Sequence, residues 1–254
     1  IIICKILARL SSIIPAKIIS CANHAIDVHS KIGYDKSKMI FIPNGYDFTR
    51  FSYDYEKSQL FLRKVNIDKS LPILGSVGRY NPQKDHSNLL SALSKVSQKG
   101  IKFKCILVGK DLDSQNTKIN NEIDSLELKD HVILLGSCNN IPDIMSSIDI
   151  HILASSYGEA FPNVIAEAMA CSTPCVVTDV GDATSIVAKT GWIVPPGDSN
   201  LLAHAIEQAV GEIRNVDWEK RREHCRSRIR RNYSITSMIK SFTEVWQTTI
   251  RSNL

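Results

Sequence analysis

An alternation of short apolar runs and amphipathic stretches begins near residue 70 and limits what the chain can fold into. Runs such as LPILGSVG, FKCILVG and IHILASS have the length of buried strands, and helical patterns such as SNLLSALSKVSQKG separate them. Apolar strands joined by helices form parallel sheets whose two faces are both covered. The predicted fold class is therefore α/β, a Rossmann-like parallel sheet of roughly six strands with helices on both faces.

The same patterning divides the chain into four parts. Residues 1–45 contain an amphipathic helix and one strand-helix-strand unit, which is too little for an independent domain. Residues 46–70 are charged, aromatic and aperiodic, as is typical of a linker. Residues 71–234 hold the predicted sheet, and residues 235–254 form a final helix. Because the chain begins with Ile rather than Met, we expect it to be part of a longer protein.

The chain of 254 residues carries a formal net charge of +5, which suits an anionic ligand or an anionic membrane surface without requiring either. The most basic segment, residues 218–233, is first of all the solvated face of a helix. Contact with anionic lipid is the alternative for this segment, and no recognition motif points to nucleic acid. Lys5, Arg9 and Lys17 interrupt the apolar opening, so it is too short for a membrane span.

Seven cysteines, an odd number, lie mostly in apolar runs, which indicates reduced thiols and a cytoplasmic location. Cys171 and Cys175 have no second pair of ligands and no neighbouring His, so we predict buried apolar side chains there and no metal site. The sequence contains neither a G-x-G-x-x-G fingerprint nor a P-loop, which argues against the common dinucleotide and nucleoside triphosphate sites.

Two turns that lead from a predicted strand into a predicted helix carry charged residues. Ligands of an open parallel sheet bind beyond the carboxyl ends of its strands, where helix N-termini attract phosphate. In the first turn, GSVGRYNPQKDHSNLL, Gly78 and Arg79 follow the strand and Lys84 precedes the helix. Two cations at one turn suit a diphosphate, because a guanidinium binds two oxygens and an ammonium adds a point charge. Taken alone, Arg79 and Lys84 could also be solvated surface residues.

The second turn lies in SYGEAFPNVIAEAMACSTPCVVTD, where Pro162 suits the first helical position. Glu159 then lies in the loop and Glu167 in the second helical turn, up to about 12 Å apart. A glutamate near a helix N-terminus can simply complement the helix dipole, but Glu167 has apolar neighbours and needs a partner. The spacing suits one carboxylate for the hydroxyls at each end of a nucleotide sugar. Between the two carboxylates, backbone N–H groups would face the phosphates. These are the N–H groups of Phe161, Asn163 and Val164.

These segments resemble the retaining glycosyltransferases of family 4, which have the GT-B architecture of two facing Rossmann-like domains. The resemblance runs from about residue 18 to the end of the chain, which would be the donor half of such an enzyme. IPNGYDFTRF is similar to the segment between the domains, GRYNPQKDHSNLLSAL to a G-R-x-x-x-x-K motif, and EAFPNVIAEAMACSTPCVVTD to an E-x7-E block. The sequence departs from the family at Asp85, where Gly often follows the Lys, and at Ser172–Thr173, where Gly is common before Pro174.

The resemblance implies roles for the matched residues. As catalytic residues, Arg79 and Lys84 would hold the donor diphosphate and stabilise the leaving group, and Glu159 would bind hydroxyls of the transferred sugar. Glu167 would bind the ribose hydroxyls, and the GSCNN loop would contact the base mostly through its backbone. The remaining donor-binding residues would be Gly78, Ser137, Cys138, Asn139, Ala160, Phe161, Pro162 and Asn163.

The resemblance further implies retaining transfer of a hexosyl group from a nucleoside diphosphate sugar, expected to be UDP-linked, without a metal or other cofactor. The acceptor would be a glycan or a lipid-linked glycan of a bacterial surface polysaccharide, such as lipopolysaccharide. Such an enzyme would be cytoplasmic, and its basic charge would suit peripheral contact with the anionic inner face of the membrane. Roughly one hundred residues of an acceptor domain would be missing, so the chain alone would bind a donor and transfer little.

Two other functions remain open at this point. The chain could be a non-catalytic nucleotide-sugar-binding module. A nucleotide-sugar epimerase fits less well, because only Glu159 is well placed to act as an acid or base at the sugar.

Overall fold

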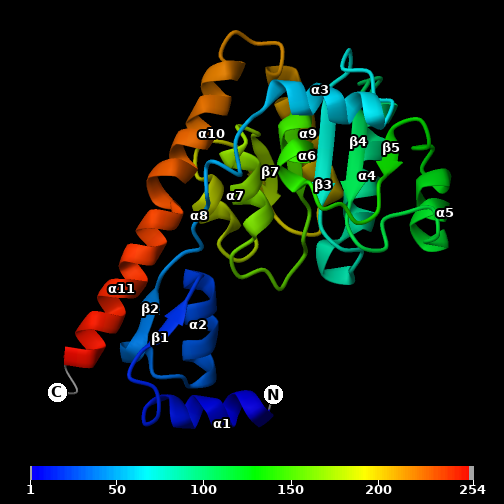
Figure 1. The fold of residues 1–254 in the computed structure, drawn as a ribbon. Helices are drawn as coiled ribbons and strands as arrows, with labels where there is room; N and C mark the ends of the chain where they lie inside the picture. Colours follow the sequence, from blue (N-terminus) through cyan, green and yellow to red (C-terminus); the bar gives the residue numbers. More distant parts are fainter. Residues whose placement is uncertain (1, 252–254) are drawn as a thin grey trace.

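The computed structural model describes residues 2–251, which form a large α/β domain, a small N-terminal unit and a long C-terminal helix (Figure 1). The C-terminal helix α11 (Ile235–Arg251) leaves the domain and runs down to the side of the N-terminal unit (Figure 1). No helix within residues 2–251 has the length and the apolar character that crossing a membrane requires.

The N-terminal unit has two parallel strands that pair over three residues, with a helix between them. Its elements are α1 (Ile2–Ser11), β1 (Ile18–Ser20), α2 (Asn23–Ile32), the 3-10 helix η1 (Lys36–Lys38) and β2 (Met39–Phe41). The elements of the α/β domain are, in chain order, α3 (Tyr55–Lys64), β3 (Ile73–Val77), the 3-10 helix η2 (Pro82–Lys84), α4 (His86–Gln98), β4 (Lys104–Val108), α5 (Thr117–Ser125), β5 (Val132–Leu134), α6 (Ile141–Ser147), β6 (Ile150–Leu153), α7 (Asn163–Ala170), β7 (Cys175–Thr178), α8 (Ala183–Val187), β8 (Trp192–Val194), α9 (Ser199–Glu212) and α10 (Trp218–Asn232).

The sheet of the domain has six strands in the order β5-β4-β3-β6-β7-β8, and every pair is parallel. The chain builds β3, β4 and β5 outward in one direction, then returns to place β6 on the other side of β3. This reversal is the topological switch point of a doubly wound sheet. The observed topology confirms the predicted α/β fold class.

Each face of the sheet has its own hydrophobic core. One face packs against α6, α7, α8 and α10, and the other packs against α4, α5 and α9. Every residue of β6 and β7 is buried, as expected for strands covered on both sides. This double burial explains why the sequence reads as continuous apolar runs rather than as an alternation of apolar and polar residues.

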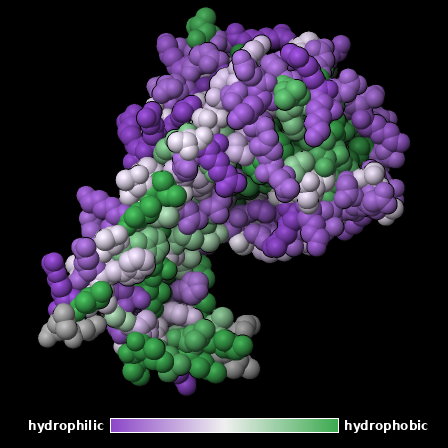
Figure 2. Space-filling model, in the orientation of Figure 1, coloured by the Kyte–Doolittle hydropathy of each residue, from purple (hydrophilic) through white to green (hydrophobic). Residues whose placement is uncertain are grey.

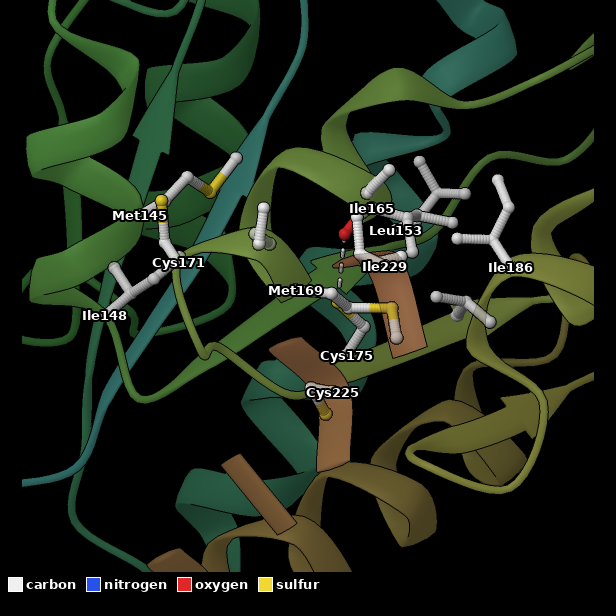
Figure 3. Packing of buried hydrophobic residues seen from close by; sticks show 14 of the residues in the cluster. Met145, Ile148, Leu153, Ile165, Met169, Cys171, Cys175, Ile186, Cys225 and Ile229 are labelled. Atoms are coloured by element: carbon white, nitrogen blue, oxygen red, sulfur yellow. Dashed lines mark hydrogen bonds between the residues drawn. The ribbon is translucent and has the colours of Figure 1, made fainter. Parts of the chain in front are cut away.

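Three cysteines lie in the core beneath α7 and α10 (Figure 3). The thiol of Cys175 points at the backbone carbonyl of Ile165 on α7, 3.9 Å away, and Met169 lies beside it (Figure 3). Burial raises the pKa of the Cys171 thiol to about 12 and that of Cys225 to about 11. The prediction of buried apolar side chains at Cys171 and Cys175 is confirmed.

The segment predicted to be an aperiodic linker contains the helix α3 (Tyr55–Lys64). Asp54 caps this helix by accepting a hydrogen bond from the Lys57 N–H at 3.0 Å. Leu62 is buried, and α3 packs against α6, where the Ser147 hydroxyl donates to the Ser58 carbonyl. Residues 55–64 are therefore helical and packed on the domain rather than aperiodic. Their sequence is misleading because a helix with few apolar residues buries one narrow stripe only.

Two residues stand where the family that the sequence resembles often has Gly. They are Asp85 and Ser172, whose φ angles are positive, at 49° and 63°. Left-handed backbone costs a residue with a Cβ roughly 1–2 kcal/mol, and glycine avoids this cost. Asp85 compensates because its carboxylate accepts a hydrogen bond from the Asn88 N–H and so caps α4. The side chain of Ser172 makes no such bond, whereas its carbonyl accepts from Arg222.

Replacing Ser172 with glycine is expected to raise the free energy of unfolding by about 0.5–1 kcal/mol, because the relief of strain exceeds the added entropy of the unfolded chain. Denaturant unfolding at pH 7 measures the change. Asp85→Gly is the matched control, since relief of strain there is offset by loss of a cap worth about 1 kcal/mol. A lower stability of Ser172→Gly than of the parent chain would contradict this account.

Candidate functional site

The switch point brings together two loops that are far apart in the sequence. Strands β3 and β6 are neighbours, with Gly75 paired to His151, so the turn after β3 and the loop after β6 leave the same edge of the sheet. This edge faces the N-terminal unit (Figure 1), and the surface is hollowed between the two parts (Figure 2). Ligands of doubly wound sheets bind at this place.

The turn after β3 is built so that Lys84 folds back over the end of the strand. Asn81 accepts a hydrogen bond from the Gln83 N–H at 2.9 Å, and Pro82 begins the short helix η2. A Cβ on Gly78 would lie 3.3 Å from Cε of Lys84, so the glycine lets the lysine side chain pass close to the backbone. The Gly78 N–H donates to Val108 at the end of β4, which fixes the turn to the sheet.

Lys84 and Glu159 form an ion pair of 2.6 Å across the switch point. Their side chains are 19% and 9% exposed, and the Ser155 hydroxyl donates to the same carboxylate oxygen at 2.7 Å. A backbone bond from the Ser156 N–H to the Gln83 carbonyl, 2.9 Å long, joins the two loops again. The predicted meeting of these loops is therefore observed, with Lys84 and Glu159 in direct contact and largely shielded from water.

Arg79 has an exposed side chain and forms no ion pair with any residue in 2–251. It follows Gly78 directly and so extends from the same turn as Lys84. A free guanidinium beside a lysine that is already paired supplies the charge a diphosphate needs. Of the two predicted cations, Lys84 is thus partly buried and paired, whereas Arg79 is exposed.

The GSCNN loop follows β5 at the same sheet edge. Gly136 accepts a hydrogen bond from the Gly109 N–H at 2.8 Å, which ties this loop to the end of β4. Ser137 and Asn139 are exposed, whereas Cys138 is half-buried and burial raises the pKa of its thiol. The loop is therefore placed where a ligand on the Gly78 turn could reach it.

The helix α7 begins at Asn163, with Pro162 as the preceding cap residue rather than the first helical one. Ala160 and Phe161 form the approach, and the buried Phe161 ring packs edge-on against Tyr233 at 5.5 Å. The Asn163 side chain is occupied, because its oxygen accepts from Tyr46 at 2.7 Å and from Asn44. The backbone N–H and the side-chain Nδ2 of the exposed Asn163 remain able to donate to a ligand.

Glu167 lies one turn after Asn163 on the same face of α7, in surroundings that differ from those of Glu159. It is half-buried and forms no ion pair with any described residue. Burial raises the pKa of Glu167, and the nearby charge of Arg50 opposes the shift. Burial and the charge of Glu167 in turn raise the pKa of Tyr46. A half-buried carboxylate without a donor would be stabilised by ligand hydroxyls that donate to it.

Three residues of this site are not predicted from the sequence: Ser155, Gln83 and Tyr46. Ser155 holds the Glu159 carboxylate within its own loop, the Gln83 carbonyl joins the two loops, and Tyr46 holds α7 from the segment that follows the N-terminal unit. These contacts lie in or between loops that have no periodicity, so no repeating pattern in the sequence signals them. Within residues 2–251 no group of three or more His, Cys, Asp or Glu side chains is arranged to hold a metal ion.

Comparison with known proteins identifies related enzymes. The chain is 24% identical over 217 residues to the UDP-Gal:alpha-D-GlcNAc-diphosphoundecaprenol alpha-1,3-galactosyltransferase of Escherichia coli, covering 84% of this chain and 54% of that protein. It is 26% identical over 171 residues to the capsular polysaccharide biosynthesis glycosyltransferase CapM of Staphylococcus aureus, covering 66% of this chain and 44% of CapM. The chain thus spans about half the length of the curated relatives it matches.

Solved structures share the fold. A glycosyltransferase from Rickettsia africae has a TM-score of 0.88 at 24% identity, with 95% of this chain and 66% of that chain covered. Anabaena HepE in complex with UDP and glucose has a TM-score of 0.86 at 20% identity, with 96% and 66% covered. These structural neighbours confirm the GT-B type of Rossmann-like domain inferred from the motifs.

The model of one protein family covers most of the α/β domain. It matches residues 58–232, from α3 to the end of α10, and includes both loops of the switch point. The chain therefore belongs to the family described as glycosyl transferases group 1.

Proposed function

We propose that the chain is the donor-binding part of a retaining glycosyltransferase that takes a hexosyl group from a nucleoside diphosphate sugar, most suitably UDP-linked. The observation that carries the proposal is the shielded Lys84–Glu159 pair of 2.6 Å beside the unpaired Arg79, at the switch point of the sheet. Cations for a diphosphate and a carboxylate for hydroxyls then lie side by side in the place where such folds bind ligands.

In the proposed reaction the bond between the anomeric carbon and the diphosphate oxygen breaks, and its electron pair leaves on the diphosphate. An acceptor hydroxyl oxygen forms the new bond to the anomeric carbon, and its proton passes to the leaving diphosphate. Arg79, Lys84 and the free N–H groups at the start of α7 would stabilise this developing charge. The proposal assigns charge neutralisation to these groups rather than to a metal ion. Glu159, held by Lys84 and Ser155, would accept hydrogen bonds from hydroxyls of the sugar.

Glu167 would accept hydrogen bonds from the ribose hydroxyls. It forms no ion pair with any described residue and burial raises its pKa, so hydrogen bonds from an incoming pair of hydroxyls would stabilise its charged form. The GSCNN loop after β5 would meet the base. The nucleotide would then lie along the carboxyl edge of the sheet, from β5 to α7.

The names of the relatives support the substrate class and a surface-glycan acceptor. Anabaena HepE was solved with UDP-glucose, and the Escherichia coli relative is named for transfer from UDP-Gal to a diphosphoundecaprenol-linked sugar. This chain would form part of a larger enzyme. By analogy, we propose that the acceptor of that enzyme is a lipid-linked glycan of a bacterial surface polysaccharide. Transfer by this chain alone is expected to be weak, since the chain spans only about half of such relatives.

Calorimetric titration of the chain with UDP, GDP and ADP tests the proposal, with UDP expected to bind best. Glu167→Ala is expected to weaken UDP binding roughly 10–100-fold, because it removes charge-assisted hydrogen bonds worth about 1.5–3 kcal/mol. Glu223→Ala is the matched control, an exposed helical glutamate on α10 bonded only to Ser227. If no nucleoside diphosphate binds, or if both variants bind UDP as the parent chain does, the proposed site is wrong.

A further inference from the structure

The helix α2 of the N-terminal unit lacks a cap from its own segment. Its cap position is Ala22, whose side chain cannot accept a hydrogen bond. The first two N–H groups of the helix donate instead to the carboxylate of Asp182, from Asn23 at 2.7 Å and from His24 at 2.9 Å. An acid of the loop after β7, 158 and 159 residues later, thus supplies the cap.

Asp182 is also fixed to the loop that carries Glu159. Its N–H donates to the Ala160 carbonyl at 2.9 Å. The preceding Gly181 has a φ of 56°, and a Cβ there would lie 2.4 Å from the Glu159 carbonyl oxygen. Residues 181–182 therefore rest directly on the backbone of residues 159–160, and only glycine at 181 permits this approach.

The buried carboxylate of Asp182 is stabilised by its hydrogen bonds to α2. The residue is 5% exposed, and no cation of residues 2–251 forms an ion pair with it. Its charge is compensated by two helix N–H groups and by the positive end of the α2 dipole. A buried charge left without these partners is costly, so α2 and the Glu159 loop are held in one arrangement.

We propose that Asp182 is a positioning residue that couples the N-terminal unit to the sugar end of the donor site. A continuous series of bonds runs from Lys84 through Glu159 and Ala160 to Asp182 and α2. Because the coupling is a free energy shared by two sites, loosening α2 also loosens the loop that presents Glu159. The part of this proposal that concerns UDP rests on the proposed function, whereas the part that concerns the loop does not.

Two variants separate coupling from simple helix capping. Asp182→Ala removes the cap and the link together. Asp182→Ala combined with Ala22→Ser restores a local cap, since serine is a good N-cap residue, but leaves the link broken. Asp182→Asn, which keeps one acceptor oxygen, is the conservative variant expected to fold and to show an intermediate effect.

Hydrogen exchange and UDP titration are the readouts. In Asp182→Ala we expect amide exchange to rise at least 10-fold in peptides covering 23–27 and 155–165, and the Kd for UDP to rise roughly 3–10-fold. Adding Ala22→Ser should restore protection of 23–27 only, with the loop and the Kd still perturbed. Asp182→Asn should lie between the parent and Asp182→Ala in all three readouts.

The outcomes are decisive in each arm. If exchange in 155–165 is unchanged by Asp182→Ala, or is restored by Ala22→Ser, then Asp182 is only a helix cap and the coupling is refuted. If the parent chain binds no UDP, the proposed function fails, but the exchange of the loop still tests the coupling. If UDP binds the parent and all variants equally well, the link from α2 to the donor site is refuted while the proposed function stands.

Discussion

Replacing Lys84 with methionine is expected to lower the affinity of the chain for UDP at least about 30-fold. The change removes one of the two cations at the diphosphate and leaves Glu159, whose side chain is 9% exposed, without its partner of 2.6 Å. Removing one member of a shielded charge pair costs about 2–5 kcal/mol, since the remaining charge is then uncompensated. That carboxylate would also repel the incoming phosphates. Calorimetry with UDP measures the loss.

Lys99→Met is the matched control, because Lys99 follows the far end of α4 and pairs with Glu207 at 2.7 Å, away from the switch point. This pair is exposed at the lysine, so little change in stability or affinity is expected. Combining Lys84→Met with Glu159→Gln should recover folding stability but not UDP affinity. If the Kd of Lys84→Met for UDP lies within about threefold of the parent value, the role of the lysine is refuted, because a threefold change in Kd corresponds to less than about 1 kcal/mol.

Acidification from pH 6.5 towards pH 4 is expected to destabilise the fold steeply through two buried histidines. His151 lies on β6 with no exposed surface, and both of its ring nitrogens lack partners among residues 2–251. Burial, aided by the charge of Lys84, lowers the pKa of His151 to about 3. His86, at the start of α4, has its pKa lowered to about 4 by the same two causes.

The direction of the change in stability follows from which state, folded or unfolded, binds the proton. Below its ordinary pKa of 6.5 each histidine is protonated in the unfolded chain but stays neutral in the folded one until the lowered value is reached. The unfolded state therefore gains protons, and the free energy of unfolding falls by about 1.4 kcal/mol per pH unit for each histidine. The pKa values of Asp149 and Glu167 are raised by burial, so protonation of these carboxyls in the folded chain acts in the opposite direction as the pH falls towards their ordinary range.

Urea unfolding of the parent chain and of His151→Leu at pH 7, 6 and 5 measures the effect. The slope of stability against pH should be smaller in the variant by about 1.4 kcal/mol per unit below pH 6.5. His204→Leu is the control, because His204 is exposed on α9, where it forms a hydrogen bond with Gln208. Parallel slopes for the parent and His151→Leu would show that His151 is protonated equally in both states, contrary to this expectation.

The candidate residues of the two loops could be found from the sequence, whereas their partners could not. Strand ends, helix starts and the charged residues between them are local features, so Lys84, Glu159 and Glu167 stand out by position alone. The pairing of Lys84 with Glu159 depends on β3 lying next to β6, and residues 84 and 159 are joined by 74 intervening positions. The groups that interact with Glu167 are Tyr46 and Arg50, rather than Arg79 or Lys84 of the turn after β3. The spacing of these residues along the chain does not indicate this.

The sequence by itself determined the class of fold, because runs of apolar residues long enough for strands and separated by helical patterns admit little besides a covered parallel sheet. It also determined the family, through a match over residues 58–232. Tertiary structure alone decided which loops meet, that α3 joins the domain, and that Asp182 caps a helix of another unit. The physical reason is that periodicity records only which side of an element is buried. The partner of a buried charge is set by packing between distant segments, whose free energy leaves no local trace in the chain.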